Sequence, residues 1–164
     1  MKRGIVLLGL VWIMVGCSLP GRLQPVDPAA LVGRPFTSEI QLTWDGEEYT
    51  GEFSRDEQGG IQLCLTGEYL ETPLCFSSGP LGCTMTQGDL SVTFAARDLP
   101  AASLVASIER AFVMLGQAQV REGEEGLLLQ AGRVMLCCGE GMSYQSLSLE
   151  RGEMIFCSMS FSDG

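Results

Sequence analysis

From residue 36 onward, apolar and polar side chains alternate along one short segment after another, and this alternation most constrains the fold. The first segment, residues 36–44, is followed by Asp45-Gly46, a dipeptide typical of a two-residue hairpin turn. A period of two places apolar side chains on one face of a strand, so the sequence predicts an antiparallel sheet with one buried face. Further segments of this kind occupy residues 49–54, 61–66, 73–77, 81–85, 90–96, 127–131, 133–138, 143–150 and 153–161.

One segment departs from this period. Between residues 98 and 116 the apolar side chains recur at helical spacing. Asp98 is a candidate N-cap, Pro100 fits a first turn, and Gly116 is a candidate exit. The segment predicts one long amphipathic helix, and the acidic stretch that follows it at residues 121–126 predicts a polar loop. The apolar stripe of the helix consists of Leu104, Ile108, Ala111, Phe112 and Leu115.

We therefore expect an α+β fold: a strongly curved antiparallel sheet, or half-barrel, of about nine or ten strands wrapped around one long amphipathic helix. A helix roughly 10 Å across cannot cover strands spaced about 4.8 Å apart unless such a sheet curls. The alternative is a stacked sandwich or barrel. Any uncovered concave surface would be an apolar ligand site, although ordinary core packing is the alternative for its aromatic members. The candidate lining residues of this apolar cavity are Ile40, Leu42, Trp44, Phe53, Phe94, Ile108 and Phe112.

The first seventeen residues predict where the protein works. Lys2 and Arg3 precede an apolar stretch, residues 5–15, that is too short to span a bilayer stably. Met14-Val15-Gly16-Cys17 resembles the lipobox of bacterial lipoproteins. That resemblance implies that Cys17 receives a diacylglycerol, with acyl chains such as palmitate, and becomes the new N-terminus. The alternative is an ordinary signal peptide with an incidental cysteine.

This interpretation divides the chain into three parts. Residues 1–16 are expected to form a lipoprotein signal peptide, and residues 17–35 a tether that begins at the lipidated Cys17. Asp27-Pro28 and Gly33 predict a short helical turn within the tether. Residues 36–164 would form the folded domain. We expect a cell-membrane protein that its lipid anchor holds at the extracytoplasmic face.

Composition excludes several functions. The formal charge of −10 becomes −12 once Lys2 and Arg3 are removed, so the sequence predicts no nucleic-acid partner. The chain has no His and no Asn, and Lys2 is its only Lys. Histidine-based acid–base catalysis, Schiff-base lysines and the phosphate-loop lysine are therefore excluded. We expect no enzyme, catalytic residue, metal site or cofactor. The alternative is a hydrolase that uses carboxylates or cysteine.

Six cysteines follow Cys17, and they have no CxxC spacing. Cys83, Cys138 and Cys157 are in step with apolar neighbours, as small buried side chains are. We expect mostly reduced, structural cysteines, and one or two disulfides are the alternative.

Residues 36–161 resemble the LolA/LolB-type lipoprotein carriers, which are half-barrels closed by helices, and the small lipoproteins of Gram-positive bacteria that share their plan. The matching stretches are EIQLTWDGEEYTGEF, Pro73-Leu74 with Leu81-Gly82, DLSVTF followed by LPAASLVASIERAF, and SLSLERGEMIFCSMSF. The resemblance implies a lipid or other apolar ligand in the concave side of the sheet. The alternative is a module that binds another envelope protein and has no small-molecule ligand.

Overall fold

One antiparallel sheet dominates the computed structural model, which describes residues 26–123 and 126–161. The predicted signal peptide (1–16) and Cys17 lie outside these residues. Six strands precede the main helix and five follow it. The strands are β1 (Phe36–Trp44), β2 (Glu47–Arg55), β3 (Ile61–Thr66), β4 (Leu74–Gly79), β5 (Gly82–Gln87), β6 (Leu90–Ala95), β7 (Gln119–Gly123), β8 (Gly126–Ala131), β9 (Val134–Cys138), β10 (Tyr144–Leu149) and β11 (Gly152–Phe161).

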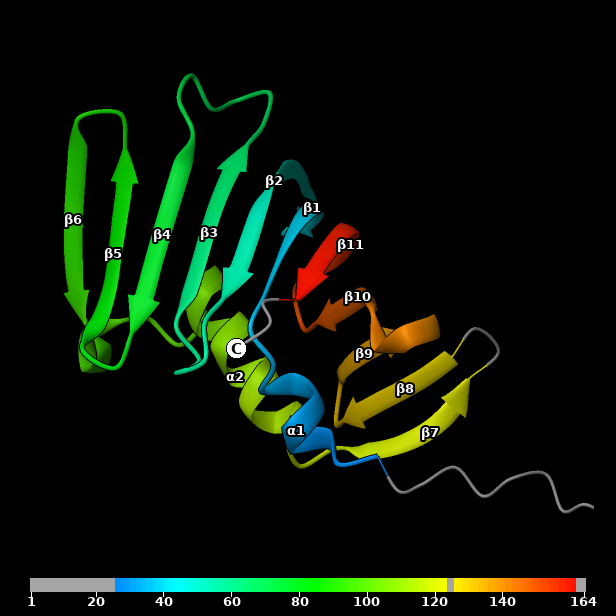
Figure 1. Cartoon of the computed structure of the whole chain (residues 1–164). Coiled ribbons are helices and arrows are strands. Elements are labelled where there is room, and N and C mark those ends of the chain that lie inside the picture. The colour runs from blue at the N-terminus through cyan, green and yellow to red at the C-terminus, as the bar shows by residue number, and fades with distance from the viewer. Residues whose placement is uncertain (1–25, 124–125, 162–164) are drawn as a thin grey trace, which may run out of the picture.

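The first and last strands of the sheet in sequence, β1 and β11, pair with each other at its centre. The spatial order is β6-β5-β4-β3-β2-β1-β11-β10-β9-β8-β7, so β6 and β7 are the two edges. Figure 1 shows β6 to β1 side by side on the left, with β11 to β7 turned relative to them on the right.

A bulge interrupts the central pair. Glu39 lies opposite Ser158 and Ile40 lies opposite Phe156, which leaves Cys157 as the additional residue. Cys157 is exposed, as is Ile155 two residues before it on the outer face, and the expectation that Cys157 is buried in step with apolar neighbours is wrong. Cys83 and Cys138 are buried, as the sequence predicts.

Two α-helices accompany the sheet. The predicted short helix is present as α1 (Pro28–Val32), where the Asp27 side chain accepts a hydrogen bond of 3.0 Å from the Ala29 N–H. The longer helix, α2 (Leu104–Leu115), begins later than expected, because its N-cap is Ser103. Asp98 instead ends a short 3₁₀ turn, η1 (Ala96–Asp98).

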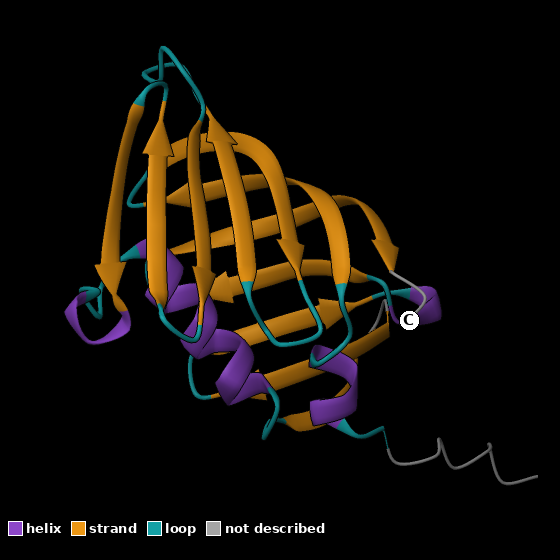
Figure 2. Cartoon of the chain, turned by 60° about the vertical axis from the view of Figure 1, so that its left-hand side comes forward, coloured by secondary structure: helices purple, strands orange, loops and turns teal. Residues whose placement is uncertain are grey.

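The expected architecture, a sheet of nine or ten strands wrapped around one long helix, is wrong. The sheet has eleven strands and is about 48 Å wide at 4.8 Å per strand, whereas the twelve residues of α2 span about 18 Å. The helix contacts α1, β8, β9 and β10. Figures 1 and 2 show it beside the lower ends of β2 and β3, with the upper parts of β4, β5 and β6 clear of both helices.

The additional strand is β7, which lies where the sequence predicts a polar loop. Its side chains are mostly exposed, and Val120 is its one apolar residue. An edge strand with one apolar residue carries no alternation that a sequence pattern can detect.

The core centres on a group of aromatic rings. The ring centroid of Phe36 lies 5.4 Å from that of Phe53 and 4.9 Å from that of Tyr144, while Phe53 stacks on Phe112 at 6.0 Å. The Tyr144 hydroxyl donates a 2.7 Å hydrogen bond to the Leu31 carbonyl oxygen, which fastens α1 to the sheet. Burial raises the pKa of Tyr144 to about 12, so this donor stays protonated at neutral pH.

A disulfide links Cys64 on β3 to Cys75 on β4. The two residues lie directly opposite each other in the ladder, which brings their Cβ atoms close. Among the described residues this one disulfide agrees with the stated alternative of one or two, and the other four cysteines agree with the expectation of mostly reduced cysteines. Cys83, Cys137, Cys138 and Cys157 are free.

Among residues 26–123 and 126–161, no helix has the length and hydropathy needed to cross a membrane.

Candidate functional site

The sheet has an inner face, against which the helices pack, and a more polar outer face. Directly opposite residues of neighbouring strands share a face, so the register identifies each inner row. One such row contains, in order from β2 to β6, Phe53, Leu63, Phe76, Met85 and Val92. Phe53 and Leu63 are fully buried, whereas Val92 is 45% exposed. The same apolar row therefore leaves the core and reaches solvent.

The neighbouring inner rows behave in the same way. Leu65 on β3 is buried, and its row continues through the half-buried Leu74 and the polar Gln87 to Leu90, which is 73% exposed. Phe94 is half-buried at the lower end of β6. We call the inner surface of β4, β5 and β6 the open apolar face. Its residues are Leu74, Phe76, Met85, Leu90, Val92 and Phe94.

The other inner side chains of β4–β6 are uncharged. Ser78 donates a 2.6 Å hydrogen bond to a carboxylate oxygen of Glu109, which links β4 to α2. Burial, with the Glu109 carboxylate as a smaller cause, raises the pKa of the Cys83 thiol. A protonated, buried thiol is a poor nucleophile and a poor metal ligand. This surface is suited to apolar contact rather than to chemistry.

A hollow of about 310 Å³ lies where β2, β3 and β4 end near α2, and it borders β4 at Gly79. Its lining includes Arg55 and Phe112. The Arg55 guanidinium lies 5.0 Å from the Phe112 ring centroid and donates a 2.6 Å hydrogen bond to the Val32 carbonyl oxygen. Burial lowers the pKa of Arg55. These contacts give Arg55 a structural role, because it joins α1, β2 and α2.

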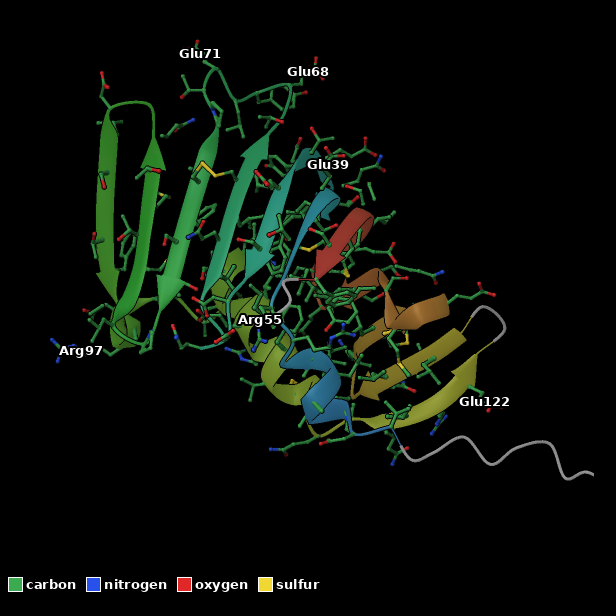
Figure 3. All side chains as sticks on the ribbon, in the orientation of Figure 1. Glu39, Arg55, Glu68, Glu71, Arg97 and Glu122 are labelled. Atoms are coloured by element: carbon green, nitrogen blue, oxygen red, sulfur yellow. A yellow bond between two sulfur atoms is a disulfide. The ribbon has the colours of Figure 1, made fainter. Side chains whose placement is uncertain are left out.

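A larger hollow, of about 790 Å³, has a different character. Its lining includes Glu48, Glu68 and Glu153, with Thr50 and Thr66 between β2 and β3. These carboxylates disfavour an apolar or anionic ligand there. In Figure 3, Glu68 lies at the upper end of the sheet, in the loop that follows β3.

Within residues 26–123 and 126–161, no three His, Cys, Asp or Glu side chains are grouped so that they could hold a metal ion. Asp45 is engaged by Arg151, whose Nε donates a 2.7 Å hydrogen bond to it.

No protein-family model matches the chain, and no curated protein matches it either. Among solved structures, the crystal structure of LprF from Mycobacterium bovis is similar. The match has 10% sequence identity and a TM-score of 0.35, and it covers 84% of this chain and 89% of that chain. A likeness at this level carries no argument about function, which we infer from the residues themselves.

The structure places the seven residues predicted to line an apolar cavity in different parts of the molecule. Five of them are buried in the central core, where they pack against one another: Ile40, Leu42, Phe53, Ile108 and Phe112. Trp44 packs at the margin of this core and lies 5.3 Å from the Arg151 guanidinium. Phe94 lies apart from them, on β6.

Sequence reasoning missed most of the open apolar face. The alternation within each strand predicts that Leu74, Phe76, Met85, Leu90 and Val92 share the apolar face, but it does not indicate that they lack a cover. The signal that could have found them is the mismatch between six apolar-faced strands before residue 98 and a single helix available to cover them.

Proposed function

We propose that the protein is a membrane-anchored, extracytoplasmic lipoprotein that binds a lipid or another apolar molecule on its open apolar face. The observation that supports this proposal most is the unbroken apolar row from the buried Leu63 to the exposed Val92. Contiguous apolar surface on a soluble domain typically marks a binding site. The disulfide and the threonines of this region lie on the outer face, and Gln87 is the one larger polar side chain on the inner surface of β4–β6.

The proposal assigns no catalysis to the protein. The inner side chains of β4–β6 carry no charge, the carboxylate of Glu109 on α2 beside them accepts a hydrogen bond from Ser78, and the Cys83 thiol is buried and neutral. Binding by contact needs neither a nucleophile nor a cofactor.

The anchor is the other part of the proposal, and it rests on the lipobox-like sequence that ends at Cys17. Two or more acyl chains on Cys17 would hold the acidic domain at the membrane by chain burial, at about 0.8 kcal/mol per CH₂ group. The open apolar face would then work close to a source of lipid.

Photo-crosslinking tests the binding site. Bacterial cells that express the full chain are fed a photoreactive, clickable fatty acid, irradiated, and analysed by peptide mass spectrometry. We expect crosslinked peptides from residues 74–95. Label on the anchor at Cys17 would appear on a different peptide, so it does not confuse the result.

The matched variants are Val92→Glu and Ile155→Glu. Val92 and Ile155 are both β-branched strand residues, exposed by 45% and 44%, but Ile155 lies on the outer face. We expect Val92→Glu to reduce crosslinking at residues 74–95 at least about tenfold, because an ionised carboxylate resists burial under a hydrocarbon chain. Ile155→Glu should leave the crosslinking unchanged. Equal loss in both variants, or no crosslink on β4–β6 in the parent, would contradict the proposal.

A second candidate function, docking of another envelope protein, is favoured by one observation on the outer face. Leu128, Cys137, Ser146 and Ile155 lie in one row across β8, β9, β10 and β11, and the row is partly exposed. Crosslinking in intact cells from position 155 to a second protein, with no lipid on β4–β6, would favour this candidate.

A further inference from the structure

The two edges of the sheet differ in how they are protected. Exposed edge strands are usually blunted by charge, proline, a bulge or a cover, because their free N–H and C=O groups can pair with another strand. The β7 edge carries Arg121 and Glu122. The β6 edge, Leu90–Ala95, carries neither charge nor proline, pairs with β5 without a bulge, and is exposed at all positions except Phe94.

We propose that β6 is a self-association edge, at which a second copy of this chain adds its own β6 in antiparallel orientation. The two sheets would then form one continuous sheet about a twofold axis. The proposal goes beyond the apolar-ligand function, and it does not depend on it.

The backbone of β6 is suited to this pairing. Gln87 and Leu90 close a two-residue turn, so Leu90, Val92 and Phe94 exchange hydrogen bonds with β5. The 3.0 Å contact between the Thr84 and Thr93 hydroxyls agrees with this pattern, since side chains approach most closely at positions that do not exchange backbone hydrogen bonds. The N–H and C=O groups of Ser91, Thr93 and Ala95 consequently point to the free edge.

The side chains restrict the register. Antiparallel partners must share a face, so inner residues pair with inner residues. A register that places Thr93 opposite Thr93 of the second copy also places Val92 opposite Phe94, and Ser91 opposite Ala95. The open apolar faces of the two copies would become continuous, and small polar side chains would line the other side.

Charge complementarity selects this register among the allowed ones. Asp89 precedes β6 and Arg97 follows it, so antiparallel pairing with Thr93 on the axis brings Asp89 of each copy to Arg97 of the other. In Figure 3, Arg97 points outward beyond the lower end of β6. Its ion pair with Asp98 is long, at 3.7 Å, and exposed, which leaves the guanidinium accessible. In a chain of net charge −10, this edge offers a second copy matched charges instead of repulsion.

Pairing of β6 with the β7 edge of another copy would be less favourable. It would place Arg121 and Glu122 beside an uncharged strand, and a contact between two different edges can propagate into an open filament. The twofold pairing of β6 with β6 closes after two copies.

A cysteine scan tests the register in the full chain, in bacterial membranes. In a background of Cys137→Ser and Cys157→Ser, the variants Ser91→Cys, Thr93→Cys and Ala95→Cys are oxidised and separated on non-reducing gels. We expect Thr93→Cys to form a disulfide-linked dimer, and each of the other two to form at least about tenfold less, because only residue 93 meets its own copy. The matched control is Arg121→Cys on the other edge.

A charge exchange tests the contact at the ends of the strand. For the full chain in detergent, we expect Asp89→Arg and Arg97→Asp each to raise the dimer dissociation constant about two- to fivefold, as for an exposed ion pair. The double variant should restore it. Thr93→Pro, which removes an N–H that points to the free edge, should abolish the dimer, whereas Thr93→Val should retain it.

The outcomes separate the possible occupants of the edge. A dimer linked through Thr93→Cys, together with rescue by the double charge variant, supports the proposal. Crosslinking from position 93 to a protein of another mass, equal crosslinking at Arg121→Cys, or a monomer in which Thr93→Pro changes nothing would overturn it. The fatty-acid experiment measures lipid-labelled peptides, whereas the cysteine scan measures disulfide-linked dimers. Either proposal can therefore fail while the other holds.

Discussion

The part of the inner face that the helices cover and the open part on β4–β6 are made of similar residues, but they differ in burial. Leu63 on β3 and Leu90 on β6 are both inner-face leucines in antiparallel strands, yet the first is fully buried and the second is 73% exposed. The difference lies in the cover, because α2 reaches the lower ends of β2 and β3 and stops short of most of β4–β6 (Figure 1). The alternation of apolar residues therefore indicates which face of a strand is the inner one. It does not indicate whether a helix covers that face.

The largest expected effect contrasts these two leucines. Leu63→Ala should lower the free energy of unfolding by about 2 to 5 kcal/mol, because it leaves a cavity in the core. Leu90→Ala should change it by less than about 0.5 kcal/mol. Chemical denaturation of both variants measures the contrast. A large loss in Leu90→Ala would mean that the open apolar face is covered in solution.

The next effect concerns the disulfide at the boundary between the two parts. Replacing Cys64 and Cys75 by Ser should cost about 2 to 3 kcal/mol, since the bond closes a loop of eleven residues. Amide exchange should rise mainly in β4–β6, which without the disulfide is joined covalently to β3 only through the backbone of residues 67–73. Cys157→Ser, at an exposed free thiol, is the matched control. Uniform exchange along the sheet would contradict a boundary at this position.

A pH dependence should arise in the covered part. The pKa of Tyr144 rises from 10 to about 12 and that of Cys138 from 9 to about 12, mainly through burial. Both groups are neutral in the folded state, so their contribution is complete below pH 9 and is lost as the pH rises from 9 to 12. Tyr144 alone should account for about 2 kcal/mol of this loss.

Tyr144→Phe should remove the part of this loss above pH 10, whereas the control Tyr69→Phe, at an exposed tyrosine, should not. Denaturation midpoints between pH 7 and 12 measure both. An unchanged slope in Tyr144→Phe would contradict the assignment to this hydroxyl.

The smallest effect concerns the polar contacts at the turns of the covered part. Arg151 binds Asp45 and donates a 2.9 Å hydrogen bond to the Ala102 carbonyl oxygen ahead of α2. Both charged side chains are 43% exposed, so Arg151→Ala should cost less than about 1 kcal/mol. A larger loss in thermal denaturation would show that polar contacts, and not only apolar burial, hold the covered part together.

The sequence allowed the strands with clear alternation to be located and α1 to be placed, because Asp27, Pro28 and Gly33 mark its ends locally. It did not reveal β7, whose single apolar residue leaves no period. The helix α2 begins later than the sequence predicts, because Asp98 and Pro100 are good helix-start residues, whereas the Ser103 cap and the apolar stripe begin after them.

The candidate site was harder to predict, because it depends on pairing between distant strands. The strand residues predicted to line a cavity lie on the same inner face as the open apolar face. The length of α2 relative to the width of the sheet decides which inner rows are covered. The bulge at Cys157 and the register that joins Cys64 to Cys75 are likewise properties of strand pairs. Single-strand patterns contain no information about them.

The Cys64–Cys75 bond ties the fold to a sequence of events in the cell. Thiols of this kind are oxidised after a chain leaves the reducing cytoplasm. Before oxidation, backbone pairing, the packing of Phe76 and the Ser78–Glu109 hydrogen bond would hold β4–β6 without a covalent cross-link. If the chain is exported, as we propose, the disulfide forms after translocation. A strain without an external thiol oxidant should then accumulate copies that proteases cleave within residues 67–95.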